Sequence, residues 1–174
     1  MTFDTIAVTL RPPIAEIRLN TAVDARLLDD LDAVVAAISD DAAIRVVLLT
    51  AVGGAFLGAA APSDSAARAA LPFRSLELMP QPVIAVIEGD AIGRGLELAL
   101  ACDMRIASDD AAFALPLEPL PRPLSHEERG DRSAMPSLGG TQRLPRLIGR
   151  GRAAEMILLG ERIDAATALL YGLV

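Results

Sequence analysis

The sequence predicts an α/β protein built around a mainly parallel sheet. Short β-branched runs that are typical of buried strands alternate with segments whose apolar residues recur at helical spacing. Such alternation favours βαβ units with right-handed crossovers. The 174 residues, of which 52% are hydrophobic, suit one globular domain over residues 1–174.

The N-terminal elements are a strand pair followed by a helix. Thr5–Leu10 and Ile14–Leu19 are predicted strands, joined by a tight connection at Arg11-Pro12-Pro13. An amphipathic helix is predicted next, because six apolar residues recur every three or four positions. These residues are Leu27, Leu28, Leu31, Val34, Val35 and Ile38.

Three later runs are predicted to be buried strands. Ile44–Thr50 is a nearly continuous apolar run, which is typical of a strand covered on both faces, and Val83–Ile87 resembles it. Met104–Ala107 is the third run. Two helices are then predicted in the segment 140–174, over Arg150–Leu159 and over Asp164–Tyr171, the second with Asp164 as N-cap.

The segment Pro116–Ser137 has a different composition. It holds five prolines, a charged run from Glu127 to Arg132 and the only histidine, His126. We expect an exposed, mobile loop here, with His126 as a solvated residue rather than a catalytic one.

Composition excludes several classes of function. The net charge of −7 and the 3% aromatic content argue against nucleic-acid binding. All sixteen basic residues are arginine, so lysine Schiff-base chemistry and a Walker lysine are absent. One histidine and one cysteine cannot build a Cys/His zinc site, and the single Cys102 suits a reducing cytoplasm. No apolar run is long enough to span a membrane, and no signal peptide is evident.

The stretch EGDAIGRGLELALACD, residues 88–103, has the pattern of a strand-to-helix turn. The first N–H groups of the helix lack intrahelical acceptors, and glycines let a ligand approach the backbone. Such a turn can hold an oxyanion, with Glu97 as an acid or base beside it. Equally, Glu97 could be a first-turn glutamate favoured by the helix dipole, beside glycines needed only for the turn.

A second turn of small residues, Ala51–Ala61, follows the strand Ile44–Thr50. Two adjacent strand-end turns, each with a free backbone N–H, are what a two-donor oxyanion hole requires.

The sequence then shows a resemblance to the enoyl-CoA hydratase/isomerase (crotonase) family. Residues 82–116, PVIAVIEGDAIGRGLELALACDMRIASDDAAFALP, resemble that family's segment P-V-I-A-x-[IV]-x-G-x-x-x-G-G-G-x-E-L-A-L-A-C-D-x-R-[IV]-A-[ST] almost position by position. RVVLLTAVGGAFLGAAA resembles its first oxyanion turn, and GGTQRLPRLIGRGRAAEMILLGERIDAATALLYGLV resembles its following helical segment. Together the matches cover most of residues 44–174.

The resemblance implies a crotonase-type spiral of ββα units that acts on acyl-CoA thioesters, as a cytoplasmic homo-oligomer, trimeric or hexameric in the family. It places the oxyanion donors at the backbone N–H groups of Ala60 and Arg94, substrate-binding residues at Gly58 and Ala59, and an acid/base at Glu97. It implies no cofactor beyond the CoA of the substrate, no metal, no nucleic acid and no membrane partner.

The chain departs from the family pattern at several positions. Arg94 stands where the family keeps glycine, and a positive φ there would strain an arginine. Leu117 occupies the position of the second family glutamate, so Glu118, one residue later, is the candidate for that role. Arg26 is the candidate contact to a CoA phosphate. The family's C-terminal helices extend beyond the position of Val174, so we expect a truncated C-terminal region.

These departures leave the reaction open. Hydration needs two carboxylates around one water, whereas isomerisation, decarboxylation or another enolate-forming reaction needs fewer groups. The competing hypothesis is a catalytically degenerate crotonase fold that serves as a CoA-binding or partner subunit.

Overall fold

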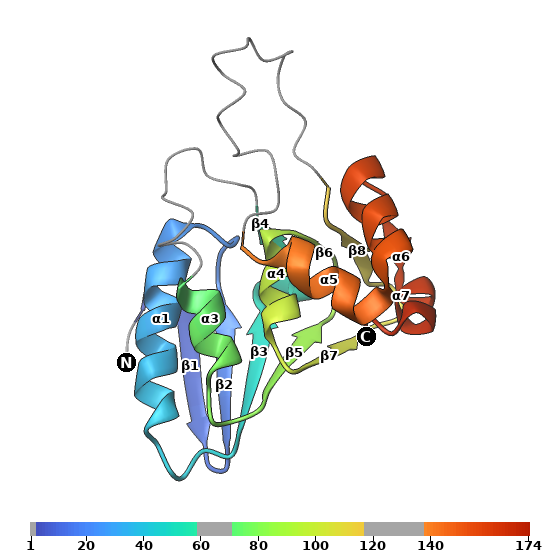
Figure 1. Cartoon of the computed structure of the whole chain (residues 1–174). Helices are drawn as coiled ribbons and strands as arrows, with labels where there is room; N and C mark the ends of the chain where they lie inside the picture. The colour runs from blue at the N-terminus through green and yellow to red at the C-terminus, as the bar shows by residue number, and fades with distance from the viewer. Residues whose placement is uncertain (1–2, 59–70, 117–137) are drawn as a thin grey trace.

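The computed structural model describes residues 3–58, 71–116 and 138–174. The chain forms two sheets with helices beside them (Figure 1). The first sheet has the strand order β1-β2-β3-β5-β7. Its strands are β1 (Ile6–Arg11), β2 (Ile14–Leu19), β3 (Val46–Ala51), β5 (Val83–Ile87) and β7 (Met104–Ala107).

The first sheet is parallel except at one edge. β1 and β2 form an antiparallel hairpin around Pro12-Pro13, as the sequence predicts, and β2, β3, β5 and β7 then pair in parallel. Parallel pairing requires crossover connections, and helices supply them. The predicted α/β class with a mainly parallel sheet is therefore confirmed.

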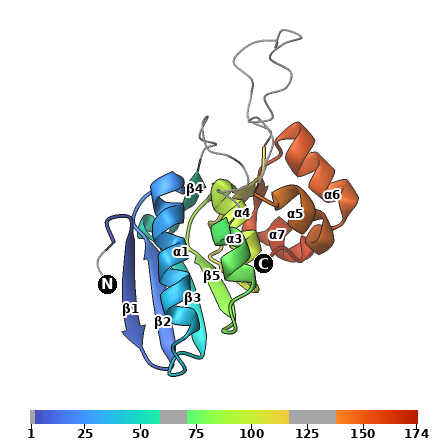
Figure 2. The ribbon, with the colours of Figure 1, turned by 60° about the vertical axis from the view of Figure 1, so that its left-hand side comes forward.

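The helices α1 (Ala25–Ser39) and α3 (Leu71–Glu77) cover one face of this sheet (Figure 2). Asp24 caps α1, because its carboxylate accepts a hydrogen bond from the Leu27 N–H at 2.9 Å. The six apolar residues that predicted this helix are all buried. Part of the hydrophobic core therefore lies between α1, α3 and the sheet, and the same cluster of buried residues continues into the C-terminal part of the chain as far as Leu173.

The predicted burial of the strands is partly wrong. Alternate residues of β3 and β5 are only half-buried, so one face of these strands packs more tightly than the other. β7 has the predicted bounds, but Met104 and Ile106 are 55% and 54% exposed. β7 pairs only with β5 and so forms an edge of the sheet, where its side chains have a neighbouring strand on one side only.

A second sheet, absent from the prediction, has the strand order β4-β6-β8-β9. A 3₁₀ turn, Val52–Gly54, leads from β3 into this sheet. Its strands have two or three residues each. They are β4 (Phe56–Gly58), β6 (Ala91–Gly93), β8 (Ala112–Ala114) and β9 (Ile163–Asp164).

Four helical segments complete the described chain, and those after β8 gather beside the second sheet (Figure 1). Asp164 caps α7 as predicted, accepting a hydrogen bond from the Thr167 N–H at 2.8 Å. The predicted helix Arg150–Leu159 continues from α-helical into π-helical geometry. The segments are α4 (Arg94–Ala101), α5 (Gly140–Ile148), α6 (Arg150–Ala154) with its π turn Glu155–Leu159, and α7 (Ala165–Tyr171).

The predicted loop Pro116–Ser137, with His126, lies outside the described residues beyond Pro116. None of the described helices is long and apolar enough to cross a bilayer.

Candidate active site

The two predicted turns meet at the ends of neighbouring strands. β4 and β6 pair in parallel, and Gly58 is opposite Gly93 in their register. After Gly93 the chain enters α4 at Arg94, and after Gly58 it continues toward Ala59 and Ala60, which lie outside the described residues. The ends of β4 and β6 are therefore adjacent, as a site with one N–H donor after each strand requires.

Close backbone contact holds these two turns together. The Gly54 carbonyl accepts hydrogen bonds from the Glu88 N–H at 3.1 Å and from the Gly89 N–H at 3.0 Å. A Cβ on Gly54 would lie 2.5 Å from the Glu88 Cβ, and Gly54 has a φ of +72°. Both the approach and the dihedral therefore require glycine.

Gly93, rather than Arg94, has the unusual backbone conformation of the turn. Gly93 is the N-cap of α4 with φ 59° and ψ −128°, whereas no described non-glycine residue has a positive φ. Arg94 therefore does not have the positive φ that would strain an arginine. As the first residue of α4, Arg94 has a backbone N–H at the positive end of the helix dipole. Its binding to a thioester oxygen stays a prediction.

Glu97 lies in the first turn of α4 and is fixed from outside its own helix. The side chain is only 2% exposed. Its Oε1 accepts hydrogen bonds from the backbone N–H groups of Leu138 and Gly140, both at 2.9 Å. The carboxylate of Glu97 thus occupies the N-terminal end of α5, where unpaired N–H groups favour an anion.

Arg143 supports the turn that holds Glu97. Its Nη1 donates to the Leu138 carbonyl at 2.6 Å, and its Nε forms an ion pair with Glu77 Oε1 at 2.5 Å. The arginine therefore ties the start of α5 to α3. We interpret Arg143 as a positioning residue for the N–H groups that hold Glu97.

Burial sets the proton affinity of Glu97. Removal of the carboxylate from water raises its pKa above the usual value of a glutamate. The N–H groups of Gly140 and Leu138, together with the charges of Arg94 and Arg143, act in the opposite direction but do not cancel the effect of burial. A carboxyl with a raised pKa, held in one orientation, suits general acid/base catalysis.

The raised pKa predicts a pH-dependent stability difference between the wild type and Glu97→Gln. The folded state holds the Glu97 proton more tightly than the unfolded state, so ionisation above the unfolded pKa of about 4.5 destabilises the folded wild type. Glutamine does not ionise. We expect the Tm of Glu97→Gln, relative to wild type, to increase as pH rises from 4.5 through the folded pKa and then to level off. A relative Tm that falls over this range would mean that the folded pKa is lowered.

The other candidate residues are not gathered at Glu97 by the described structure. Arg26 is exposed on the first turn of α1, and no ion pair or hydrogen bond within the described chain joins it to Glu97 or Arg94. Ala59, Ala60 and Glu118 lie outside the described residues, so their roles stay predictions.

Sequence reasoning missed the partners that hold Glu97. Gly140 and Arg143 belong to the G-G-T-Q-R run, residues 139–143, and Leu138 directly precedes it; in the sequence this run is only a mark of the family resemblance. A glycine pair at a predicted helix start signals free N–H groups that a buried carboxylate can use. That signal was available, but nothing in the sequence indicated which carboxylate would occupy it.

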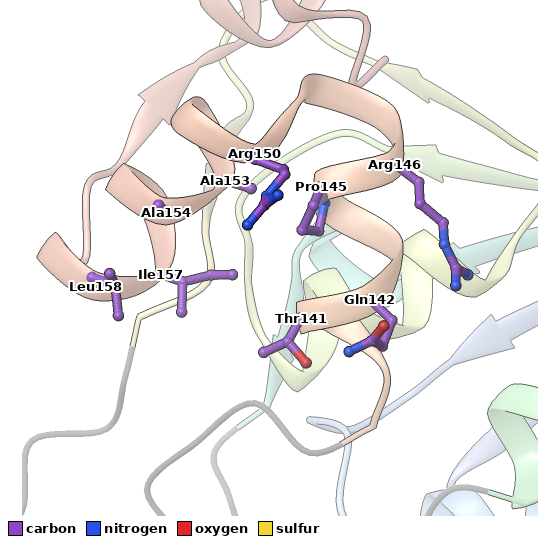
Figure 3. Close-up of a pocket in the computed structure, with 9 residues that line it drawn as sticks. All are labelled: Thr141, Gln142, Pro145, Arg146, Arg150, Ala153, Ala154, Ile157 and Leu158. Carbon is purple, nitrogen blue, oxygen red and sulfur yellow. The ribbon is translucent and has the colours of Figure 1, made fainter.

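A cavity of about 540 Å³ lies between α5 and α6 (Figure 3). Arg150 points into the space between the two helices, whereas Arg146 points away from it (Figure 3). No carboxylate lines this cavity, and none of the predicted site residues does. It therefore lacks the groups for acid/base chemistry. Its lining residues are Thr141, Gln142, Pro145, Arg146, Arg150, Ala153, Ala154, Ile157 and Leu158.

A family model described as "Enoyl-CoA hydratase/isomerase" matches residues 6–174. The chain belongs to the enoyl-CoA hydratase/isomerase family. The sequence-based family prediction and the crotonase fold are thereby confirmed.

Curated members of this family and solved structures resemble the chain over nearly all of its length. The short-chain-enoyl-CoA hydratase of Clostridium acetobutylicum is 36% identical over 88% of this chain and 59% of its own. The 2,3-dehydroadipyl-CoA hydratase of Escherichia coli is 36% identical over 97% of this chain and 64% of its own. The enoyl-CoA hydratase structure from Bacillus anthracis superposes with a TM-score of 0.81 at 36% identity, covering 98% of this chain and 69% of that one. The chain thus spans less than two thirds of the length of these two curated relatives.

Proposed function

We propose that this chain catalyses an enoyl-CoA hydratase/isomerase-type reaction on acyl-CoA thioesters. The N–H groups of Ala60 and Arg94 bind the thioester oxygen, and Glu97 transfers the proton at the α carbon. Family membership and the names of the relatives support the substrate class. The buried carboxylate of Glu97, fixed one helical turn after Arg94, is the observation that carries the proposal.

The chemistry follows from where charge develops. Adding or removing a proton α to a thioester passes through an enolate, whose negative charge lies on the thioester oxygen. Two backbone N–H groups aimed at that oxygen stabilise the charge, and each such donor contributes about 2.7–4 kcal/mol. A carboxyl with a raised pKa can then give and take the α proton near neutral pH.

Glu97 is sufficient for the enolate step, but hydration also needs a group that activates water. Glu118 is the candidate for this second role. With Glu97 alone, isomerisation or decarboxylation uses the same enolate. The cytoplasmic location and the homo-oligomeric state also stay predictions. Nothing in the described part of the chain favours the degenerate, partner-subunit alternative.

The exchange of α protons tests the proposal without assuming which of these reactions occurs. The purified chain is incubated with butyryl-CoA in D₂O, and loss of the α-proton signal is followed by NMR. We expect exchange well above the rate without protein. Hydration of crotonyl-CoA, measured in parallel, then separates a hydratase from an enzyme that only forms the enolate. Binding of acetoacetyl-CoA is the third measurement. No exchange, no hydration and no binding would together overturn the proposal.

A further inference from the structure

The side chain of Arg94 is a buried cation without a counter-ion in the described structure. The residue is only 8% exposed. Its Nη1 is fully buried and has no hydrogen-bond partner. No ion pair within the described chain involves its guanidinium. A buried charge left unpaired destabilises a folded protein substantially, so such groups are normally paired.

The position of Arg94 places this cation at the proposed active site. Arg94 and Glu97 are three residues apart in α4, so their side chains project from the same side of the helix. The charge of Arg94 is near enough to lower the pKa of Glu97, although the two residues form no ion pair. The Oε1 of Glu97 is instead taken by the N–H groups of Leu138 and Gly140.

The guanidinium therefore has donor capacity that no described group uses, beside the carboxylate that handles the α proton. A guanidinium has five N–H donors in a planar fork that matches a carboxylate. Arg94 is also the proposed oxyanion donor. An anion bound to its guanidinium therefore lies no further from the thioester oxygen than about the length of the arginine side chain. The thioester joins the acyl chain to the pantetheine arm, and because that arm has no anionic group near the thioester, an anion at this point belongs to the acyl chain.

We propose that the Arg94 guanidinium binds a carboxylate on the acyl group, so that the chain selects short acyl-CoA thioesters that end in a carboxylate. The inference rests on the proposed function, because it assumes that the thioester lies at the N–H of Arg94. It assigns the side chain of Arg94 a role in specificity that is separate from the role of its backbone.

Paired ligands of equal chain length test this role. Succinyl-CoA and butyryl-CoA differ in whether the acyl chain ends in a carboxylate or a methyl group, and free CoA lacks the acyl group. The Kd of each is measured by calorimetry for the wild-type chain, Arg94→Met, Arg94→Lys and Arg45→Met. The Arg45→Met control removes an exposed positive charge just before the N-terminal end of β3.

We expect the wild type to bind succinyl-CoA roughly 10- to 100-fold more tightly than butyryl-CoA, because hydrogen bonds to charged groups contribute that much. Arg94→Met should remove the preference, Arg94→Lys should keep part of it, and Arg45→Met should keep all of it. Methionine retains the backbone N–H, so binding of butyryl-CoA should persist. The unliganded Arg94→Met protein should also have a higher Tm, since an unpaired buried charge is gone.

The outcomes that overturn the inference are distinct. Equal Kd values for the two acyl-CoAs in the wild type, or a preference unchanged in Arg94→Met, would overturn it while α-proton exchange still supports the proposed function. If Arg94→Met binds free CoA more weakly than wild type does, the guanidinium binds a phosphate of CoA and not an acyl carboxylate, which would also overturn the inference. A wild type that binds no acyl-CoA at all would overturn both proposals. If Arg94→Met does not fold, the ratio of the Kd values for butyryl-CoA and succinyl-CoA in Arg94→Lys tests the inference instead. A ratio equal to that of wild type would contradict a bidentate guanidinium contact.

Discussion

Glu97→Gln is expected to lower the rate of α-proton exchange of butyryl-CoA by roughly 10²- to 10⁴-fold, the usual contribution of a positioned acid or base. Glutamine has nearly the shape of glutamate, and its Oε1 can still accept the hydrogen bonds from Leu138 and Gly140. It cannot take up the α proton. The measurement is NMR-monitored exchange in D₂O at saturating ligand.

The binding and folding of the variant separate a chemical role from a structural one. Glu97→Gln should bind butyryl-CoA with a Kd close to that of wild type and should be at least as stable at neutral pH, because burial of a charged carboxylate is relieved. Glu161→Gln, at an exposed position, is the matched control and should exchange at the wild-type rate. Exchange by Glu97→Gln at the wild-type rate would remove Glu97 from the mechanism.

The sequence predicts the first sheet well because its strands carry strong local signals. β2, β5 and β7 have the predicted bounds, since each strand begins and ends with a hydrophobic residue and none contains glycine or proline. Local sequence signals do not show which strands will lie beside each other in the sheet. β7 was therefore predicted as buried, although its position at the sheet edge leaves Met104 and Ile106 exposed.

The second sheet was missed for a physical reason of another kind. Its strands are two or three residues long, too short to show an alternating pattern, and five of their eleven residues are alanine or glycine, which have low strand propensity. They form because β4, β6 and β8 pair with one another across long sequence separations, not because any one prefers extended structure. The register that brings Gly58 opposite Gly93 is a product of that pairing.

In the candidate site, too, features within one segment are predicted from the sequence, whereas contacts between distant segments are not. Glu97 and the glycine turn before it were found from the sequence, because both lie within one strand-to-helix segment. The sequence does not show whether Arg94 has a positive φ, because only the backbone geometry shows that Gly93 has it instead. The hydrogen bonds that fix Glu97 come from residues more than forty positions away.

Gly140→Ala is expected to displace the Glu97 carboxylate and so to impair both folding and catalysis. A Cβ at position 140 would lie 2.7 Å from Leu115 Cδ2, 2.8 Å from Glu97 Cγ and 2.9 Å from Glu97 Oε1. Overpacking of this kind costs about 1–3 kcal/mol. A carboxylate moved by about 1 Å can lose on the order of 10²-fold in rate. Chemical denaturation and α-proton exchange measure the two effects.

Gly151→Ala is the matched control, because it adds the same methyl group to a nearby helix in open space. Apart from its chain neighbours and the backbone of its own helix, no heavy atom lies within 4 Å of a Cβ at position 151, which lies inside α6 and is exposed. Alanine is favoured over glycine within a helix by about 0.5–1 kcal/mol, so this variant should be slightly more stable than wild type and equally active. We expect Gly140→Ala to lower the rate of the folded protein through the position of Glu97, whereas Gly151→Ala should leave Glu97 in place. A Gly140→Ala variant that exchanges α protons at the wild-type rate would show that the contact between α5 and Glu97 has no part in catalysis.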